Sequence, residues 1–362
     1  MKILAIDTSC DETAAAVTEE TAILSNVVWS QASAHAKFGG VMPSLAQRMH
    51  EERIDWVINK ALKNAQCSMS DVQCLAVTAG PGLAIALEVG IRRAKELARE
   101  LKIPLIPVNH VEGHVLSPLA YSRGIKGGGI VFPAIGLVVS GKHTDVILIK
   151  KIGDYEILAE TMDDALGEAL DKAARMLGLG YPGGAILEKM AKEGNPKMYP
   201  LPLPMARREE KNAFSYSGLK TAFFRLTESL NRASRQAGLS KEQIQDLAAV
   251  FQDRAFEHVV RISARIIQDL KDKEYKIKDL LVGGGVGANV ELRNRLRKMA
   301  NEFDLKVHFP YSTRLYGDNA AMIGVAAGFN IQDLRFRIQD LNLIDREPRA
   351  RIDKGFKREE NK

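Results

Sequence analysis

Two strand–turn–strand patterns, far apart in the sequence, constrain the fold of this chain more than any other feature. The first places a polar turn at residues 8–13 between two apolar segments, and the second places one at residues 140–144. Neither turn contains Asn-Gly or another dipeptide that is typical of ordinary hairpins. The repetition predicts two α/β halves built on one plan, each offering a polar turn to a shared cleft.

Length and glycine content predict where the halves divide. With 362 residues and 46% hydrophobic content, the chain can bury cores for two domains. Three consecutive glycines within residues 124–129 indicate a linker. We expect a first domain at 1–125, completed by a C-terminal helix at 319–340, a second domain at 131–318, and a frayed, charged tail at 345–362.

Composition excludes several classes of protein. No apolar run approaches the roughly 20 residues of a membrane span, and the N-terminal segment lacks the long apolar region of a signal peptide. The three cysteines have no metal or redox spacing. We therefore expect a cytoplasmic protein that makes no membrane contact. The net charge of +6 permits a nucleic-acid partner without requiring one.

The segment Asn109-His110-Val111-Glu112-Gly113-His114 follows a short apolar run and carries a candidate metal site. Side chains four apart lie on the same side of a helix, because each residue advances about 100°. Two imidazoles placed in this way can share a transition metal, although two histidines on a polar helix face can also be unrelated. The chain has only seven histidines, which favours the metal.

A zinc protease does not fit this spacing. That class of enzyme needs a glutamate directly after the first histidine, so that its carboxylate reaches the metal-bound water. Glu112 is two residues from each histidine, about 200° around the helix and on its far face. Peptide hydrolysis is therefore contradicted by the position of the acid.

Two later segments extend the candidate site. The apolar run before Gly283-Gly284-Gly285 and the helix predicted after it would let the backbone approach a nucleotide closely, although glycines can also simply permit the turn. No P-loop or nicotinamide-type glycine motif occurs. Asp318 precedes another predicted helix. It is either an N-cap or the third metal ligand, and two imidazoles with one carboxylate would leave a coordination position open.

Together, several stretches resemble the universal tRNA threonylcarbamoyladenosine transferases of the TsaD type, formerly described as glycoproteases. They occur in that family's order between residue 2 and about residue 330. The stretches are Ile6–Thr13, Gly40–Pro43 with Arg48 and His50, Ala79–Leu83, Asn109–His114, Val139–Gly141 with His143 and Thr144, Gly167–Lys172, Tyr181–Gly184, Phe214–Lys220, Gly284–Val286 with Asn289, and Asp318–Ile323.

The resemblance implies the actin/hsp70/sugar-kinase (ASKHA) fold, in which two related α/β domains enclose a nucleotide and metal cleft. It also implies an acyl transfer. The threonylcarbamoyl group of threonylcarbamoyl-AMP passes to N6 of the adenosine 3′-adjacent to the anticodon, in tRNAs that read ANN codons, and AMP is released.

The resemblance also implies roles for individual residues. His110, His114 and Asp318 are similar to the family's ligands for one divalent ion, with Fe2+ expected first and Zn2+ as the alternative. The adenylate is expected to bind Ser140, Gly141, Lys142, His143, Thr144, Asp171, Gly184, Glu188 and Asn289. For the tRNA phosphates we expect Arg207, Arg208, Lys211 and Lys220, each of which could equally be ordinary surface.

The chemistry suits these residue types. An exocyclic amine is a poor nucleophile, so a Lewis-acid metal that polarises the acyl or phosphate oxygen would help the reaction. Asp11 or Glu12, in the first polar turn, is the candidate general base. The target base must also be presented out of its stack.

The chain departs from the family's pattern at two places. Lys142 stands where the family usually has glycine, which puts a cation in the turn expected nearest the phosphates. This cation either strengthens adenylate binding or points outward without effect. Tyr316 and Gly317 stand where many bacterial members have Cys-Thr. The second departure alters the surroundings of Asp318 more than the ligand itself.

Three rival functions differ in ways that can be tested. The inactive paralogue of the bacterial system (TsaB type) lacks the metal histidines, which this chain has. A sugar or acetate kinase would consume ATP with a small acceptor, and a metalloprotease conflicts with Glu112. If the protein is bacterial, the resemblance implies that the paralogue and a small P-loop ATPase (TsaE type) act as its partners.

Overall fold

A computed structural model describes residues 1–122, 129–206, 212–234, 238–331 and 341–356. By its internal contacts the chain divides into two units. Unit 1 comprises Met1–Ile130, Ile149–Glu156 and His308–Lys362, and unit 2 comprises Val131–Leu148 and Ile157–Val307. The predicted linker at 124–129 lies almost wholly outside the described residues.

The first sheet has six strands in the order β5-β4-β1-β2-β3-β6. The strands are β1 (Lys2–Asp7), β2 (Glu12–Glu19), β3 (Ala22–Ser30), β4 (Cys74–Gly80), β5 (Leu105–Asn109) and β6 (Tyr121–Ser122). Strands β1 and β2 pair antiparallel from Lys2↔Glu19 to Asp7↔Ala14, so the first predicted hairpin is confirmed. Glu12 begins β2 rather than lying in the turn itself.

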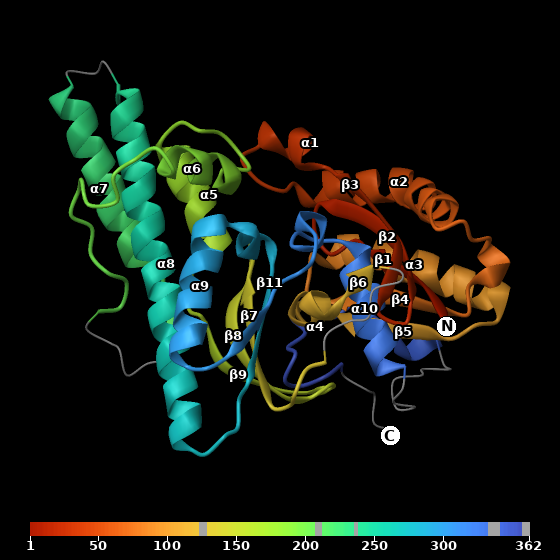
Figure 1. Ribbon diagram of the computed structural model, residues 1–362. Coiled ribbons are helices and arrows are strands. Elements are labelled where there is room, and N and C mark those ends of the chain that lie inside the picture. Colours follow the sequence, from red (N-terminus) through yellow and green to blue (C-terminus); the bar gives the residue numbers. More distant parts are fainter. Residues whose placement is uncertain (123–128, 207–211, 235–237, 332–340, 357–362) are drawn as a thin grey trace, which may run out of the picture. The chain divides into compact units, whose positions relative to one another are not determined.

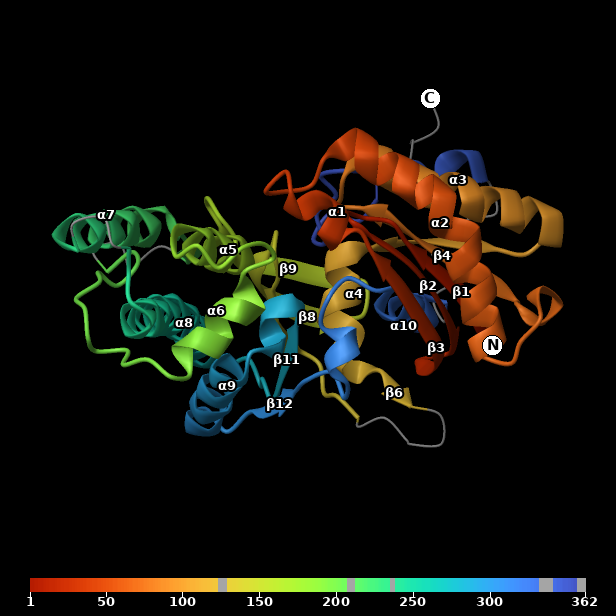
Figure 2. The ribbon, with the colours of Figure 1, turned by 90° about the horizontal axis from the view of Figure 1, so that it is seen from above.

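Helices cover both faces of this sheet (Figure 2). They are α1 (Ala32–Ala36), α2 (Pro43–Asn64), α3 (Ala84–Leu101), α4 (His110–Leu116) and α10 (Ala320–Asn330). Leu4 and Ile6 of β1 join the apolar core that α2 and α3 bury. On the opposite face, α10 packs so closely that a Cβ at Gly324 would lie 2.7 Å from Cγ2 of Thr18. The alternation of side chains along β1 thus supplies two cores.

The C-terminal segment corrects one expectation. Fraying from Asp345 is wrong for residues 345–356, because this part of the tail packs on unit 1. The Glu347 amide donates to the Ala79 carbonyl (2.8 Å), and the Gly82 amide donates to the Pro348 carbonyl (3.2 Å). Ile344, just before the tail, belongs to the core cluster. These burials and backbone hydrogen bonds outweigh the charged composition that suggested disorder.

The second sheet has the strand order β10-β9-β8-β7-β11-β12. Its strands are β7 (Ala134–Val139), β8 (Thr144–Lys151), β9 (Asp154–Thr161), β10 (Ala213–Phe214), β11 (Asp279–Gly283) and β12 (Lys306–His308). Strands β7 and β8 are neighbours, so the second predicted hairpin is confirmed, and β11 runs parallel to β7. The residues around the β8–β9 turn, Ile149–Glu156, belong to unit 1.

The helices of unit 2 are α5 (Leu166–Met176), α6 (Gly184–Ala191), α7 (Ser217–Ala233), α8 (Lys241–Asp272) and α9 (Val290–Glu302). Helix α8 is long and contacts α5, α6, α7 and α9 (Figure 1). Its N-terminus has a capping box, in which the Ser240 hydroxyl and the Gln243 amide side chain each accept a backbone N–H. No described helix is long and apolar enough to cross a membrane.

Candidate metal centre and substrate loops

The carboxyl end of β5 places the two histidines. Asn109 ends the strand and caps α4, because its side-chain oxygen accepts the N–H groups of Val111 (2.9 Å) and Glu112 (3.3 Å). The helix therefore begins at His110, and the four-residue spacing brings His114 beside it. The two ring centroids are 4.7 Å apart, in an edge-to-face arrangement.

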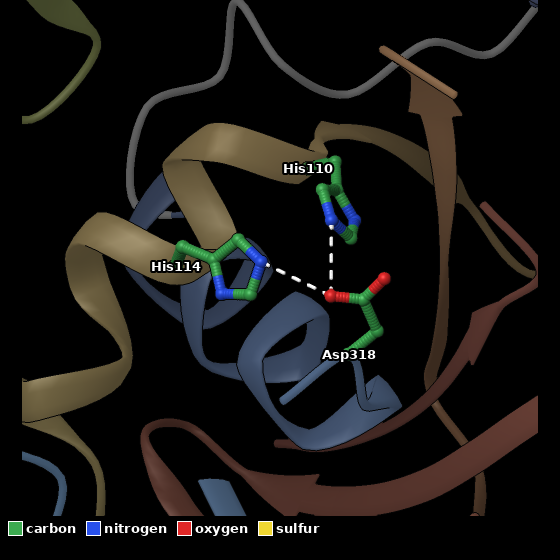
Figure 3. A group of neighbouring side chains, drawn as sticks. All are labelled: His110, His114 and Asp318. Atoms are coloured by element: carbon green, nitrogen blue, oxygen red, sulfur yellow. Dashed lines mark ion pairs between the residues drawn. The ribbon is translucent and has the colours of Figure 1, made fainter. Parts of the chain in front are cut away.

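Asp318 completes the group from the segment before α10 (Figure 3). Its Oδ1 atom lies 3.4 Å from Nε2 of His110 and 3.2 Å from Nε2 of His114. One ligand atom from each residue lies within 4.8 Å of the others. The N-cap of α10 is Asn319, whose side-chain oxygen accepts the Met322 N–H. The alternative role of Asp318 as an N-cap is therefore wrong.

The electrostatics of this group favour the forms that bind metals. Burial lowers the pKa of His114, which keeps the imidazole neutral. Burial alone would raise the pKa of Asp318, but the adjacent His110 and His114 bring it well below its usual range. Nε2 of His114 is buried, and its contact with Oδ1 of Asp318 (3.2 Å) lacks the geometry of a hydrogen bond. Two imidazole nitrogens and one carboxylate oxygen are a ligand set that fits a divalent transition metal.

Asn319 also holds the backbone at Tyr316 and Gly317, the two residues that depart from the family's pattern. Its side-chain amide donates to the Gly317 carbonyl (2.8 Å), while its oxygen caps α10. Tyr316 is buried. The segment that carries Asp318 is thus fixed at both ends, although its two preceding residues are not the Cys-Thr of many bacterial members.

Glu112 is turned away from this group, as the spacing predicts. Its carboxylate accepts the Tyr155 hydroxyl (2.7 Å) and the Asn330 amide (3.2 Å). Burial raises the pKa of Glu112 to about 7, although both hydrogen bonds oppose the rise. Glu112 is therefore an anchor on the opposite side of α4 from the histidines, and the arrangement lacks the acid of a zinc protease.

The two candidate bases lie at the end of the first polar turn (Asp11) and at the start of β2 (Glu12). Glu12 is half-buried and accepts the Ser30 hydroxyl (3.0 Å). Burial, followed by the neighbouring charges of Asp11 and Asp318, raises the pKa of Glu12 well above its ordinary value. A carboxylate with a raised pKa is a stronger base once ionised.

The second polar turn is held by its own serine and by α5. The Ser140 hydroxyl accepts the N–H groups of Lys142 (3.3 Å) and His143 (3.0 Å), and the Thr144 hydroxyl accepts the N–H of Leu166 (2.8 Å). Nothing lies within 4 Å of a Cβ built on Gly141, and Lys142 is exposed. The turn therefore has an open backbone face at Gly141.

The other predicted adenylate residues of unit 2 hold turns in place. Oδ1 of Asp171 accepts the N–H groups of Gly183 and Gly184, both at 2.8 Å, and burial raises its pKa. Glu188 accepts the Val290 N–H (3.1 Å) at the start of α9. Asn289 caps α9 and donates to Oε1 of Gln252 (3.0 Å).

The sequence did not predict that Gln252 of α8 binds Asn289, because Gln252 is far from any motif. Helical periodicity could have placed Gln252 on a buried face, but no signal in the sequence pairs it with Asn289. The contact of Tyr155 on β9 with Glu112 was also not predicted, because no motif includes Tyr155.

Of the four residues predicted to bind tRNA, only Lys220 is among the described residues. Arg207, Arg208 and Lys211 lie outside the described residues. Lys220 pairs with Asp164, whose carboxylate also binds Lys172 at 2.6 Å. Lys172 also pairs with Glu168 (2.8 Å), so the two cations of this cluster are balanced by carboxylates, and Lys220 would have to exchange Asp164 for a phosphate to bind tRNA.

Solved structures with the same fold support the architecture. Over 91% of this chain and 48% of its own length, HypF from T. kodakarensis matches with a TM-score of 0.53 and 15% identity. A full-length HypF in a phosphate- and nucleotide-bound form matches over 92% of this chain and 46% of its own, with a TM-score of 0.54 and 14% identity. With the two mixed sheets, these matches confirm the ASKHA fold class.

The family is shown by closer relatives. The model of the TsaD family, tRNA N6-adenosine threonylcarbamoyltransferase, matches residues 22–325. The curated protein of that name from Bacillus subtilis is 43% identical over 90% of this chain and 89% of its own. The one from Chelativorans sp. is 44% identical over 90% and 88%. The chain therefore belongs to the tRNA N6-adenosine threonylcarbamoyltransferase family of transferases.

Proposed function

We propose that the protein transfers the threonylcarbamoyl group of threonylcarbamoyl-AMP to N6 of the adenosine 3′-adjacent to the anticodon, in tRNAs that read ANN codons, and releases AMP. The names of the curated relatives support threonylcarbamoylation of tRNA. The group of buried His110 and His114 with half-buried Asp318 is the observation that carries the proposal for this chain. An inert paralogue would not need it.

The three residues of this group would hold one divalent ion, with Fe2+ first and Zn2+ as the alternative. When bound, the ion would act as a Lewis acid on an acyl or phosphate oxygen. Asn109 and Asn319 cap α4 and α10, and so fix the elements that carry or adjoin the ligands. Well-fixed ligands lower the reorganisation needed for binding.

The remaining roles follow from chemical type. The open backbone face of the turn 140–144 suits the phosphate and acyl end of the adenylate, and the Lys142 cation suits the phosphate. Asp171 would accept ribose hydroxyls, beside Gly184 and Glu188, with Asn289 near the nucleotide. Asp11 or Glu12 would take the proton that N6 loses when its bond to the carbamoyl carbon forms. Lys220, with Arg207, Arg208 and Lys211, would bind tRNA phosphates.

The proposal includes a cytoplasmic location and, in a bacterial setting, two partners: an inactive paralogue of the TsaB type and a small ATPase of the TsaE type. The test supplies purified protein with threonylcarbamoyl-AMP and unmodified tRNA, then follows AMP release and the modified nucleoside by mass spectrometry. Parallel reactions add the two partners. Consumption of ATP with a small acceptor, and no modified nucleoside with competent partners present, would instead indicate a kinase.

A further inference from the structure

His50 of α2 is buried and forms two hydrogen bonds to the first hairpin, one to its turn and one to strand β2. Its Nδ1 atom lies 2.8 Å from the Thr13 hydroxyl, and its Nε2 atom lies 3.0 Å from the Cys10 carbonyl. Asp11 and Glu12, the candidate bases, are the two residues between these contacts. One side chain thus bridges both ends of the segment on which the proposed proton transfer depends.

The partners fix one proton of the ring. A carbonyl oxygen only accepts, so Nε2 must carry a proton. In the neutral ring, Nδ1 accepts the Thr13 hydroxyl proton, whereas in a protonated ring Nδ1 would donate to the Thr13 oxygen instead. Burial lowers the pKa of His50, which is consistent with a neutral ring.

A second buried histidine supports the same segment from α1. The Met42 N–H donates to Nδ1 of His35 (3.2 Å), so Nε2 of His35 must donate to the Gln31 side chain (2.9 Å). The Gln31 backbone N–H in turn donates to the Asp11 carbonyl (2.9 Å). The backbone that carries Asp11 is therefore held by hydrogen bonds that involve two uncharged imidazoles.

We propose that His50 is a positioning residue for the transfer reaction: its neutral imidazole bridges Cys10 and Thr13 and so orients the carboxyl groups of Asp11 and Glu12. This inference rests on the proposed function, because it assigns the orientation a role in proton transfer. The competing explanation is that His50 only packs α2 against the sheet. In that case, its loss would lower stability without a specific effect on the chemical step.

The test compares two substitutions that remove a threonine hydroxyl from β2 while keeping the side-chain shape. Thr13→Val removes the partner of His50. The matched control is Thr18→Val, because the Thr18 hydroxyl is buried and has no hydrogen-bond partner among the described residues. We expect Thr13→Val to lower kcat by roughly tenfold or more, with KM and bound metal close to those of the control. Its thermal midpoint should fall below that of the control, because the buried Nδ1 of His50 loses its partner. Thr13→Ser should restore kcat.

Two further measurements are independent of that comparison. In His50→Gln, the side-chain amide can donate to Cys10 at the position of Nε2, but it then places no acceptor at the position of Nδ1 for Thr13. Adding Thr13→Val to it should therefore cause no further loss of kcat. In 15N-histidine-labelled protein, the His50 signal should show a proton on Nε2 only, and Thr13→Val should shift its Nδ1 resonance.

The possible outcomes distinguish a failure of the proposed transfer function from a failure of the positioning role of His50. A wild-type protein that is inactive with competent partners would overturn the proposed function and this inference with it. An active wild type with equal kcat for Thr13→Val and Thr18→Val, or a His50 ring protonated on Nδ1, would overturn the inference alone.

Discussion

Replacing Glu112 by glutamine should remove a specific pH dependence of stability. An ordinary glutamate has a pKa of 4.5, and burial on α4 raises that of Glu112 to about 7. Below about pH 4.5 the carboxyl is protonated in both the folded and the unfolded chain. As the pH rises toward 7, the unfolded chain releases this proton first, so the free energy of unfolding falls. Above about pH 7 the loss is complete.

The size of the effect follows from the difference between the two pKa values. At about 1.4 kcal/mol for each pKa unit, Glu112 should lower the free energy of unfolding by about 3 kcal/mol between about pH 4 and about pH 8. Glutamine has no such titration. It can still accept the Tyr155 hydroxyl and, after rotation of the Asn330 amide, donate to Oδ1 of Asn330. Among the described residues, this buried oxygen has no hydrogen-bond partner.

The assay is urea unfolding of both proteins over this pH range, in the presence of a chelator so that metal binding does not contribute. The advantage of the Gln variant over wild type should grow by about 3 kcal/mol as the pH rises. Tyr155→Phe removes a hydrogen bond that lowers the pKa of Glu112, so the transition should move to higher pH. A difference between wild type and Glu112→Gln that does not change with pH would refute the reasoning.

Other predictions address the ligands and loops. His114→Ala should abolish bound metal, measured by elemental analysis, and modified nucleoside, while circular dichroism shows a folded chain. Asp171→Asn keeps an acceptor for Gly183 and Gly184 but loses the charge, so KM for the adenylate should rise about tenfold with little change in kcat. Gly284 has φ +90° and its Cβ would lie 2.4 Å from the Val139 carbonyl oxygen. Gly284→Ala should therefore lower the free energy of unfolding by at least about 2 kcal/mol in urea titrations.

Local sequence patterns predicted the elements that carry the candidate site. The two hairpins and the strand-to-helix turn at Asn109 each have a signal within a few residues: apolar alternation, a polar turn or a capping side chain. The pairing of His110 with His114 follows from helical periodicity alone. Their proximity to Asp318 has no local signal: residue type left Asp318 as either an N-cap or a third ligand, and the resemblance favoured the ligand.

Long-range contacts explain what the sequence did not predict. The charged composition of the tail at 345–356 predicts fraying, yet its backbone forms hydrogen bonds with the backbone of Ala79 and Gly82. From the sequence, the side chain of Asn289 could cap a helix or bind a nucleotide. The structure shows that its oxygen caps α9 and that its amide donates to Gln252. Asp318 and Asn319 are both good N-caps by residue type, and the register of α10 selects the second.

The most direct test of the central claim uses two tRNAs that differ at one nucleotide. One has adenosine 3′-adjacent to the anticodon, and the other has guanosine there. Each is incubated with threonylcarbamoyl-AMP, the protein and the two partners, and the nucleosides are identified by mass spectrometry. We predict threonylcarbamoyladenosine from the first tRNA only, and none when His114→Ala replaces the wild type. Equal modification of both tRNAs, or none with partners of proven competence, would contradict the claim.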